Sequence, residues 1–278
     1  MLVMNVRAIA EKRVKLGFTG PHVRAFFLNL VRSVDEKLAE QLHNPPPPAP
    51  YAVKPVSKIV FKARKVRRLY GGELQIDVND KVSFGFALLT SELVEKYSLD
   101  ILNALFENER VNIAGGEFLI SEITVEKIDE VQKGDFERLL VKFQTPTFFR
   151  KKDSDYRDIF PTPRNVMTSV ARIWKLLSGE DIDLDAIREL SEKKIGVIMY
   201  NLKSSRTIEL GKGRKVVGFI GKCVYEAKDA EAVEVMNQFL KIGEITNIGG
   251  SRALGFGVIE CIPVTKELSE KIISREQT

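Results

Sequence analysis

The first 42 residues change from an alternating apolar pattern to a helical one. Residues 2–10 are predicted to form a strand, and Thr19-Gly20-Pro21 supplies a hydroxyl and an early proline that are typical of a helix start. From there to about Leu42, apolar residues recur at spacings of three and four, which places them on one side of a helix. This core-facing stripe contains Val23, Phe26, Phe27, Leu30, Val34 and Leu38. The prolines at 45–48 end the predicted helix.

The rest of the first half continues with further strands and one helix. The pattern predicts strands at 57–66, 74–77 and 82–88, a helix at about 91–106, and strands around Val111 and at 118–125. With the first strand and helix, the order becomes strand, helix, two strands, helix, strand. This order is typical of a ferredoxin-like (βαββαβ) domain. The charged segment 127–134 is predicted to be a linker, so the first domain spans residues 1–127.

The second half repeats this order with additions. The pattern predicts a strand at 136–143, a polar loop at 150–157, helices at 165–177 and from Leu184, strands at 195–208 and 216–225, and a helix at 230–240. The turn Gly211-Lys212-Gly213 joins the two strands as a hairpin, and a glycine-rich loop leads to the last strand. The predicted fold class is therefore α+β, with two tandem ferredoxin-like domains. The second domain, 135–278, carries the hairpin and the glycine-rich loop.

The glycine-rich loop, residues 247–257, indicates a contact with phosphate. It holds four glycines, whose backbone N–H groups can approach an anion closely, and Arg252 adds a guanidinium between them. A dinucleotide-binding site is disfavoured, because its glycines follow a strand and open a helix, whereas here a helix precedes and a strand follows. A nucleic acid is therefore the expected ligand, and a plain glycine-rich turn is the structural alternative.

Composition is consistent with a polyanionic partner. The 278 residues include 43 Lys plus Arg against 38 Asp plus Glu, which gives a net charge of +5 and a pI near 9.0. The only cysteines, Cys223 and Cys261, lie in apolar runs and are predicted to be buried thiols in a reducing, cytoplasmic setting. No segment reaches the roughly 18 uncharged apolar residues of a membrane span, so we expect a soluble protein without a membrane partner.

Two segments concentrate positive charge. Residues 51–70 carry seven cations and no acid. They are Lys54, Lys58, Lys62, Arg64, Lys65, Arg67 and Arg68. A strand here would align several of them along a phosphate backbone, or would form a solvated basic sheet edge. The second group, Lys203, Arg206, Lys212, Arg214 and Lys215, surrounds the predicted hairpin and is open to the same two interpretations.

Acid–base candidates are few. The chain has two histidines, His22 and His43, and His43 lies at the predicted helix end, where it is either a catalyst or a helix cap. The acidic groups 153–155 and 181–185 lack the pattern of a metal or calcium site and are explained as solvating or helix-capping residues. Serine-hydrolase, phosphate-loop and zinc motifs are missing from the sequence. The sequence therefore predicts handling of RNA or DNA with neither a metal nor a cofactor.

Three motifs together resemble those of a known family. The helix ending at His43 is followed by the segment 50–56, then by Val216-Val217-Gly218-Phe219-Ile220-Gly221, and finally by the glycine-rich loop. In this order they resemble the CRISPR repeat-processing endoribonucleases of the repeat-associated mysterious protein (RAMP) superfamily, and the resemblance covers nearly the whole chain. It implies two ferredoxin-like domains that bind repeat RNA across a basic surface and cleave precursor CRISPR RNA without metal. In such cleavage the ribose 2′-hydroxyl attacks the adjacent phosphate, leaving 2′,3′-cyclic phosphate and 5′-hydroxyl ends.

The resemblance also implies roles for single residues. His43 matches the family histidine at the end of the first helix and is expected to be the acid–base group. Lys54, which stands where the family commonly has a small hydroxyl residue before proline, and Arg252 of the glycine-rich loop are the expected catalytic cations. The expected RNA contacts are Arg24, Arg32, Lys58, Lys62, Arg64, Arg67, Lys203, Arg206, Lys212, Arg214, Gly249, Gly250, Ser251, Gly255 and Gly257.

The chain departs from the family pattern near His43. Its first helix has no tyrosine, and the region where a lysine is common holds Pro48, Ala49 and Pro50. A non-catalytic subunit that binds repeat RNA, or a scaffold of a CRISPR complex, is therefore the alternative function. A general RNA-modifying or DNA-binding protein is a third. Association with other CRISPR effector subunits and a homodimer are left open.

Overall fold

The computed structural model describes residues 1–62, 65–69, 73–131, 134–151, 154–179, 181–210 and 213–265, and for residues 61–72 and 177–178 no side chain is described. The chain divides into two compact units. Unit 1 comprises residues 1–129, 207–216 and 251–256, and unit 2 comprises residues 130–206, 217–250 and the chain from Gly257 on. The tip of the predicted hairpin, residues 207–216, and residues 251–256 of the glycine-rich loop are thus grouped with unit 1, while the two long strands of the hairpin lie in unit 2.

Unit 1 is built on a six-stranded sheet in the order β4-β3-β6-β1-β8-β7. Its strands are β1 (Leu2–Ala10), β3 (Tyr51–Lys62), β4 (Lys65–Leu69), β6 (Lys81–Leu88), β7 (Arg110–Ile113) and β8 (Gly116–Lys127). The central strands β3, β6, β1 and β8 are antiparallel neighbours, as the ferredoxin-like fold requires. A separate pair is formed by β2 (Val14–Leu16) and β5 (Leu74–Ile76).

The helices of unit 1 are α1 (Gly20–Val34), α2 (Glu36–His43) and α3 (Ser91–Phe106). They bury apolar side chains against the sheet. The Phe27 ring of α1, for example, lies 4.9 Å from the Tyr51 ring and 5.2 Å from the Phe86 ring. Most of the predicted stripe is buried, which confirms the face that the spacing indicated.

The predicted single helix up to Leu42 is wrong, because Asp35 interrupts it. Asp35 has an extended backbone, with φ −153°, and its carboxylate accepts a hydrogen bond from Leu38 N–H at 3.0 Å. It therefore caps a new helix, α2, as an aspartate at an N-cap commonly does. The Tyr97 hydroxyl also donates to this carboxylate, at 3.3 Å. The apolar periodicity continues across the break, since Leu38 and Leu42 are buried, and so the pattern concealed it.

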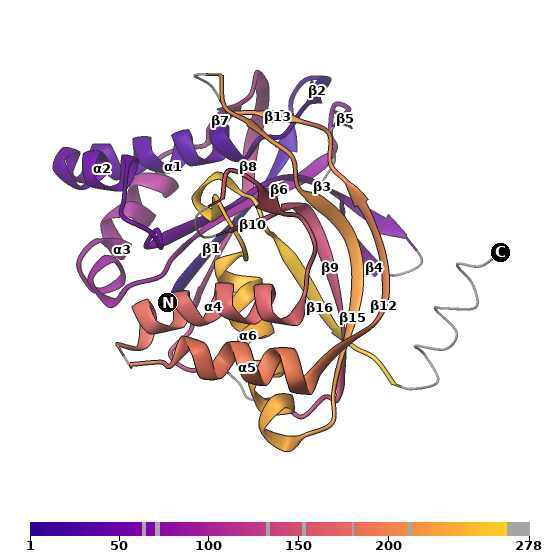
Figure 1. The fold of residues 1–278 in the computed structure, drawn as a ribbon. Helices are drawn as coiled ribbons and strands as arrows, with labels where there is room; N and C mark the ends of the chain where they lie inside the picture. The colour runs from indigo at the N-terminus through magenta and orange to yellow at the C-terminus, as the bar shows by residue number, and fades with distance from the viewer. Residues whose placement is uncertain are drawn as a thin grey trace. The chain divides into compact units, whose positions relative to one another are not determined.

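Unit 2 repeats the ferredoxin-like arrangement. Its sheet has the order β12-β15-β9-β16, with every neighbouring pair antiparallel. The strands are β9 (Arg138–Thr147), β12 (Ile195–Ser204), β15 (Phe219–Ala227) and β16 (Ile259–Pro263), and the helices are α4 (Pro163–Ser178), α5 (Leu184–Lys194) and α6 (Ala230–Thr246). The helices α4 and α5 lie side by side (Figure 1). The predicted α+β fold with two ferredoxin-like domains is confirmed.

Short elements complete the chain. Unit 2 contains β10 (Phe149–Arg150) and β11 (Arg157–Asp158), while unit 1 contains β13 (Ile208–Glu209), β14 (Lys215–Val216) and the 3₁₀ helix η1 (Arg252–Leu254). Cys223 and Cys261 are free thiols, of which Cys223 is buried, as predicted, and Cys261 is half-buried. Burial raises the pKa of Cys223 to about 12. Within the described part of the chain, none of the helices combines the length and hydrophobicity of a membrane span.

We expect the Asp35 cap to make the thermal stability of the protein depend on pH in the acidic range. The hydrogen bond from Leu38 N–H lowers the pKa of Asp35 below its ordinary value of about 3.9. A group whose pKa falls on folding stabilises the protein above its unfolded pKa, and this contribution disappears as pH falls through the folded value. Thermal unfolding should place the midpoint of Asp35→Ala below that of the wild type at neutral pH.

Asp35→Asn is the matched control, because asparagine keeps a capping oxygen but has no charge. At neutral pH its midpoint should lie between those of the wild type and Asp35→Ala. The gap between wild type and Asp35→Asn should close in acid. A gap that stays constant down to pH values below the folded pKa would contradict the assigned role of the charge.

Candidate active site

His43 is the last residue of α2, and its side chain is exposed. The helix ends there because Asn44 leaves the helical conformation and four prolines follow, none of which has an N–H to continue the helix. The predicted helix-end position of His43 is thus confirmed. An imidazole at this place is accessible to a ligand in solution.

Arg24 and Tyr51 hold the backbone at this helix end. The Arg24 guanidinium donates from Nη2 to the carbonyl oxygen of His43 and, at 3.4 Å, to that of Leu42. Its Nε donates to the Tyr51 hydroxyl at 2.7 Å, and this hydroxyl in turn donates to the Leu42 carbonyl at 3.0 Å. These contacts satisfy carbonyl groups that have no partner within a helix end. Arg24, which the sequence predicted to contact RNA, is therefore engaged inside the protein.

Tyr51 takes part in this network as a neutral phenol. The side chain is fully buried between α1 and the sheet, and burial raises its pKa above the ordinary value. The hydroxyl therefore keeps its proton at neutral pH and can act as the donor to Leu42. Its hydroxyl bonds with Arg24 and with the Leu42 carbonyl, so Tyr51 helps to fix the backbone next to His43.

Arg252 is buried, and this differs from the exposed position that the sequence predicted. Only 6% of its surface is accessible, and Nη2 donates to the carbonyl oxygen of Ala49 at 3.3 Å. Burial lowers the pKa of Arg252 to about 10, so the guanidinium remains protonated at neutral pH. Arg252 thus supports the segment between His43 and β3 from within unit 1.

The backbone N–H groups of the glycine-rich loop donate hydrogen bonds to acceptors within the protein. Gly249 N–H donates to Ser169 Oγ at 2.7 Å, and Gly250 N–H donates to the Phe148 carbonyl at 2.8 Å. Gly255 N–H donates to the Arg252 carbonyl at 2.9 Å, and Gly257 N–H to the Pro146 carbonyl at 3.1 Å. In this structure these four amides therefore donate within the protein, and the contact of the loop glycines with RNA stays a prediction. Ser251, also predicted to bind RNA, is half-buried with a positive φ of 57°.

The glycines allow close packing instead. A Cβ on Gly20, at the start of α1, would lie 1.9 Å from the Leu254 carbonyl oxygen, and one on Gly255 would lie 2.6 Å from the Pro55 ring. The ring of Phe256 contacts that of Phe18, with centroids 4.7 Å apart. Residues 251–256 are thereby packed against α1 and β3, the two elements that flank His43 in the sequence.

The remaining predicted cations of α1 and β3 differ in how exposed and how engaged their side chains are. Lys54 is half-buried on β3, opposite Gly85 of β6. Lys58 forms an ion pair with Asp80, and both side chains are about one-quarter exposed. Residues 51–70 themselves contain no acid, and Asp80 lies in a turn outside this range, so the sequence did not predict this ion pair. Arg32 is exposed and donates to Asn29 Oδ1 at 2.9 Å.

The other predicted RNA contacts of β3, β4 and the hairpin region are either exposed or outside the described residues. Lys203, Arg206 and Arg214 are exposed. Arg64 and Lys212 lie outside the described residues, and the side chains of Lys62 and Arg67 do so as well. These predictions therefore stay predictions.

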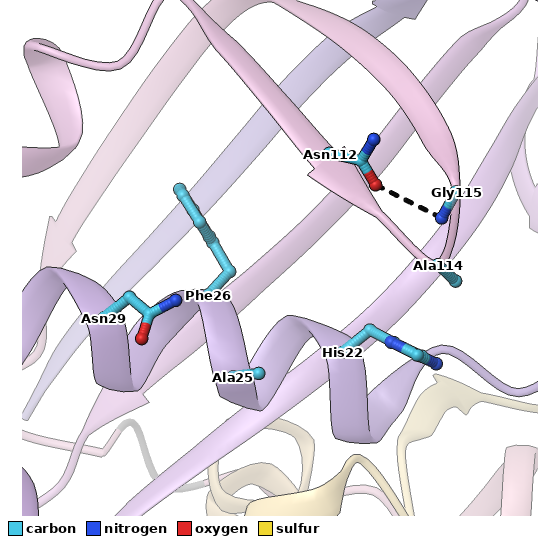
Figure 2. Close-up of a pocket in the computed structure, with 7 residues that line it drawn as sticks. All are labelled: His22, Ala25, Phe26, Asn29, Asn112, Ala114 and Gly115. Carbon is cyan, nitrogen blue, oxygen red and sulfur yellow. Dashed lines mark hydrogen bonds between the residues drawn. The ribbon is translucent and has the colours of Figure 1, made fainter.

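The other histidine, His22, lines a cavity of about 340 Å³ between α1 and the turn that joins β7 to β8 (Figure 2). Its lining consists of His22, Ala25, Phe26, Asn29, Asn112, Ala114 and Gly115. Within this lining, the side-chain oxygen Oδ1 of Asn112 accepts a hydrogen bond from Gly115 N–H at 3.2 Å. Among the described residues, no Lys or Arg side chain lines this cavity, so it does not suit a phosphate group. We therefore place the candidate active site at His43.

Sequence comparison identifies a family for part of the chain. The model of the CRISPR-associated endoribonuclease Cas6 family matches residues 141–259. No curated protein sequence matches the chain significantly.

Structure comparison covers nearly the whole chain. The Cas6 (TTHB231) product complex has a TM-score of 0.71 at 18% identity, covering 94% of this chain and 99% of that one. Thermus thermophilus Cas6 (TTHB231) has a TM-score of 0.65 at 18% identity, with coverages of 94% and 98%. A RAMP protein that binds different RNA substrates has a TM-score of 0.60 at 16% identity, with coverages of 94% and 100%. The family match confirms the resemblance to the CRISPR-associated endoribonuclease Cas6 family over residues 141–259, and the structural matches show that the fold is shared over 94% of the chain.

The packing role of the glycines predicts a difference between two alanine substitutions. A Cβ on Gly257 would lie 1.8 Å from the Ile248 carbonyl oxygen, and the φ of Gly257 is +71°. Gly115 has a similar φ of +81°, but a Cβ there would meet nothing within 4 Å. We expect Gly115→Ala to cost about 1 kcal/mol in free energy of unfolding from backbone strain alone, and Gly257→Ala to cost clearly more. Chemical denaturation of the two variants measures this, and equal losses would contradict the packing role.

Proposed function

We propose that this chain, which matches the Cas6 family model over residues 141–259, is an endoribonuclease that cuts precursor CRISPR RNA within its repeats without a metal ion. The observation that carries the proposal is the exposed His43 side chain at a helix end whose backbone is held by Arg24. The fold shared with Cas6 proteins over 94% of the chain supports it. Cas6 structures with bound product and with a substrate mimic also support RNA as the ligand.

The proposed reaction needs proton transfer and charge stabilisation. The 2′-oxygen of one ribose forms a bond to the adjacent phosphorus while the bond from phosphorus to the 5′-oxygen breaks. The 2′-hydroxyl loses a proton and the departing 5′-oxygen gains one, so an imidazole can serve at either step. We assign this role to His43. Lys54, on the strand that follows, is the proposed cation for the negative charge that develops on the phosphate.

Arg24 and Arg252 are proposed to position these groups. Both guanidinium groups donate hydrogen bonds within the protein, one to the carbonyls of Leu42 and His43 and the other to the carbonyl of Ala49. Together they hold the two ends of the proline segment that connects α2 to β3. Their effect on catalysis would therefore pass through the position of His43 and Lys54.

A non-catalytic repeat-binding subunit is the second candidate. It is favoured by the engagement of Tyr51, whose hydroxyl is buried in hydrogen bonds with Arg24 and Leu42. The hydroxyl of the tyrosine nearest to His43 in the sequence is thus buried and hydrogen-bonded within the protein, where a substrate does not reach it. This candidate predicts salt-sensitive binding of repeat RNA with no strand scission.

Cleavage in the presence of EDTA separates the two candidates. We expect the pure protein to cut labelled repeat RNA from its host once per repeat, leaving a 2′,3′-cyclic phosphate. The end is identified by its resistance to ligation until the cyclic phosphate is removed. Binding of every host repeat without any cut would establish the second candidate and reject the first.

Replacing the imidazole should remove most of the activity. Positioned acid–base groups contribute roughly 10²- to 10⁴-fold, so we expect His43→Ala to lower the single-turnover rate by about 10²-fold or more. His22→Ala, on the same unit, is the matched control and should retain the rate. If His43→Ala lowers the rate by less than about threefold, His43 is not the acid–base group, and Lys54 becomes the candidate catalytic residue.

Two arginines of α1 allow the positioning role to be tested. We expect Arg24→Ala to lower the single-turnover rate by about tenfold while leaving RNA affinity nearly unchanged, because a misplaced catalytic group slows the reaction without removing binding contacts. Arg32→Ala is the comparison variant: it loses a predicted RNA contact and an exposed contact with Asn29, so at saturating protein it should retain the single-turnover rate. A parallel loss of RNA affinity in Arg24→Ala would show that this guanidinium contacts RNA directly.

A further inference from the structure

Unit 2 exposes several aromatic side chains next to one insertion. The segment 149–162 lies between β9 and α4, where a ferredoxin-like fold needs only a short connection, and it contains β10 and β11. Within it, Tyr156 is 81% exposed and Phe160 is 40% exposed. Tyr200 of β12 is 60% exposed. Aromatic rings dominate the energetics of cores and interfaces, so their exposure here calls for a binding role.

Phe160 and Tyr200 form a pair. Their ring centroids are 5.6 Å apart, and the rings are nearly perpendicular, at 85°. Tyr200 is opposite Cys223 in the strand register, so its side chain leaves the sheet on the face where Cys223 enters the core. The hydroxyl of Tyr225 on this same face donates to the Pro161 carbonyl at 2.8 Å, which anchors the segment next to Phe160.

The backbone of Phe160 is fixed although its ring is exposed. Its N–H donates to Asp158 Oδ1 at 3.0 Å. Its carbonyl oxygen accepts hydrogen bonds from Thr162 N–H at 3.0 Å and from Asn165 Nδ2 at 3.2 Å. A ring on such a fixed backbone loses little freedom when a ligand stacks on it.

Two arginines lie opposite each other on the same insertion. Arg150 of β10 pairs in register with Arg157 of β11, and both are exposed. The Arg157 guanidinium also lies over the Phe148 ring, 4.9 Å from its centroid. Two guanidinium groups in direct cross-strand positions can donate N–H hydrogen bonds to one phosphate.

We infer that Arg150, Arg157, Phe160 and Tyr200 form a binding surface for unpaired RNA nucleotides. Bases that are not in a duplex stack on aromatic rings, and their phosphates meet guanidinium groups, which is the combination present here. The two arginines favour a polyanion over an apolar protein face as the occupant. The inference rests on the proposed function only in taking RNA as the ligand, and it requires neither His43 nor cleavage.

Binding of a single-stranded RNA of about 12 nucleotides without repeat sequence tests the surface. Stacking contributes about 1–3 kcal/mol per base, so we expect the double variant Phe160→Ala, Tyr200→Ala to lower the affinity at least tenfold. An RNA duplex of the same length, whose bases are stacked in the helix, should bind nearly as it does to the wild type. Phe106→Ala is the matched control, because Phe106 is 59% exposed at the end of α3 in unit 1.

Salt dependence tests the arginines separately. We expect Arg150→Gln, Arg157→Gln to reduce the log–log salt slope for the single-stranded RNA by about 1.4, at roughly 0.7 per phosphate lost. The aromatic double variant should keep the wild-type slope. All four side chains are exposed, so the thermal unfolding midpoints of both double variants should stay near that of the wild type.

Several outcomes would overturn the inference. One is an aromatic double variant that binds the single-stranded RNA within about twofold of Phe106→Ala, and another is a wild type that does not bind it. Unchanged RNA binding with lost self-association in sedimentation would assign the rings to a protein contact instead. If the wild type binds as expected but cuts no repeat RNA in EDTA, the proposed function fails while this surface stands.

Discussion

The carbonyl groups at the end of α2 need hydrogen-bond donors, and the arrangement around His43 depends on how unit 1 supplies them. A helix leaves its last carbonyls without partners in the helix. Here Arg24 of α1 and Tyr51 of β3 provide the donors from two elements that are separate from α2. The result is a fixed backbone that carries an exposed imidazole. Such a combination suits a group that must meet a substrate in a defined place.

The glycine-rich loop shows how one sequence pattern can serve either of two physical purposes. Glycines permit an approach to a phosphate through free N–H groups, and they equally permit an approach to another backbone. In this structure the amides of Gly249, Gly250, Gly255 and Gly257 are all engaged within the protein. The close contacts of Gly20 with Leu254 and of Gly255 with Pro55 explain why no larger side chain fits. Arg252 then acts as a buried donor to Ala49 rather than as an exposed cation.

The cations show the limit of counting charges along a chain. Residues 51–70 have no acid, yet Lys58 is neutralised by Asp80 from a neighbouring turn. Arg24 is withdrawn into the hydrogen bonds of a helix end. Conversely, the sequence pattern predicts only a polar loop at 150–157, although the strand register brings Arg150 and Arg157 opposite each other. Which cations are available to a polyanion depends on partners that are distant in the sequence.

The sequence by itself determined the order of elements in both ferredoxin-like units and the helix-end position of His43. Both follow from local physics, because apolar spacing selects strand or helix and prolines end a helix. The break at Asp35 was missed since the apolar stripe runs on through α2, and only the hydrogen bond to Leu38 reveals the cap. Tertiary structure alone decided that Arg24, Tyr51 and Arg252 support the backbone near His43, and that Phe160 meets Tyr200. Those pairings join residues about 9 to 200 positions apart, and no local preference specifies such contacts before the chain is packed.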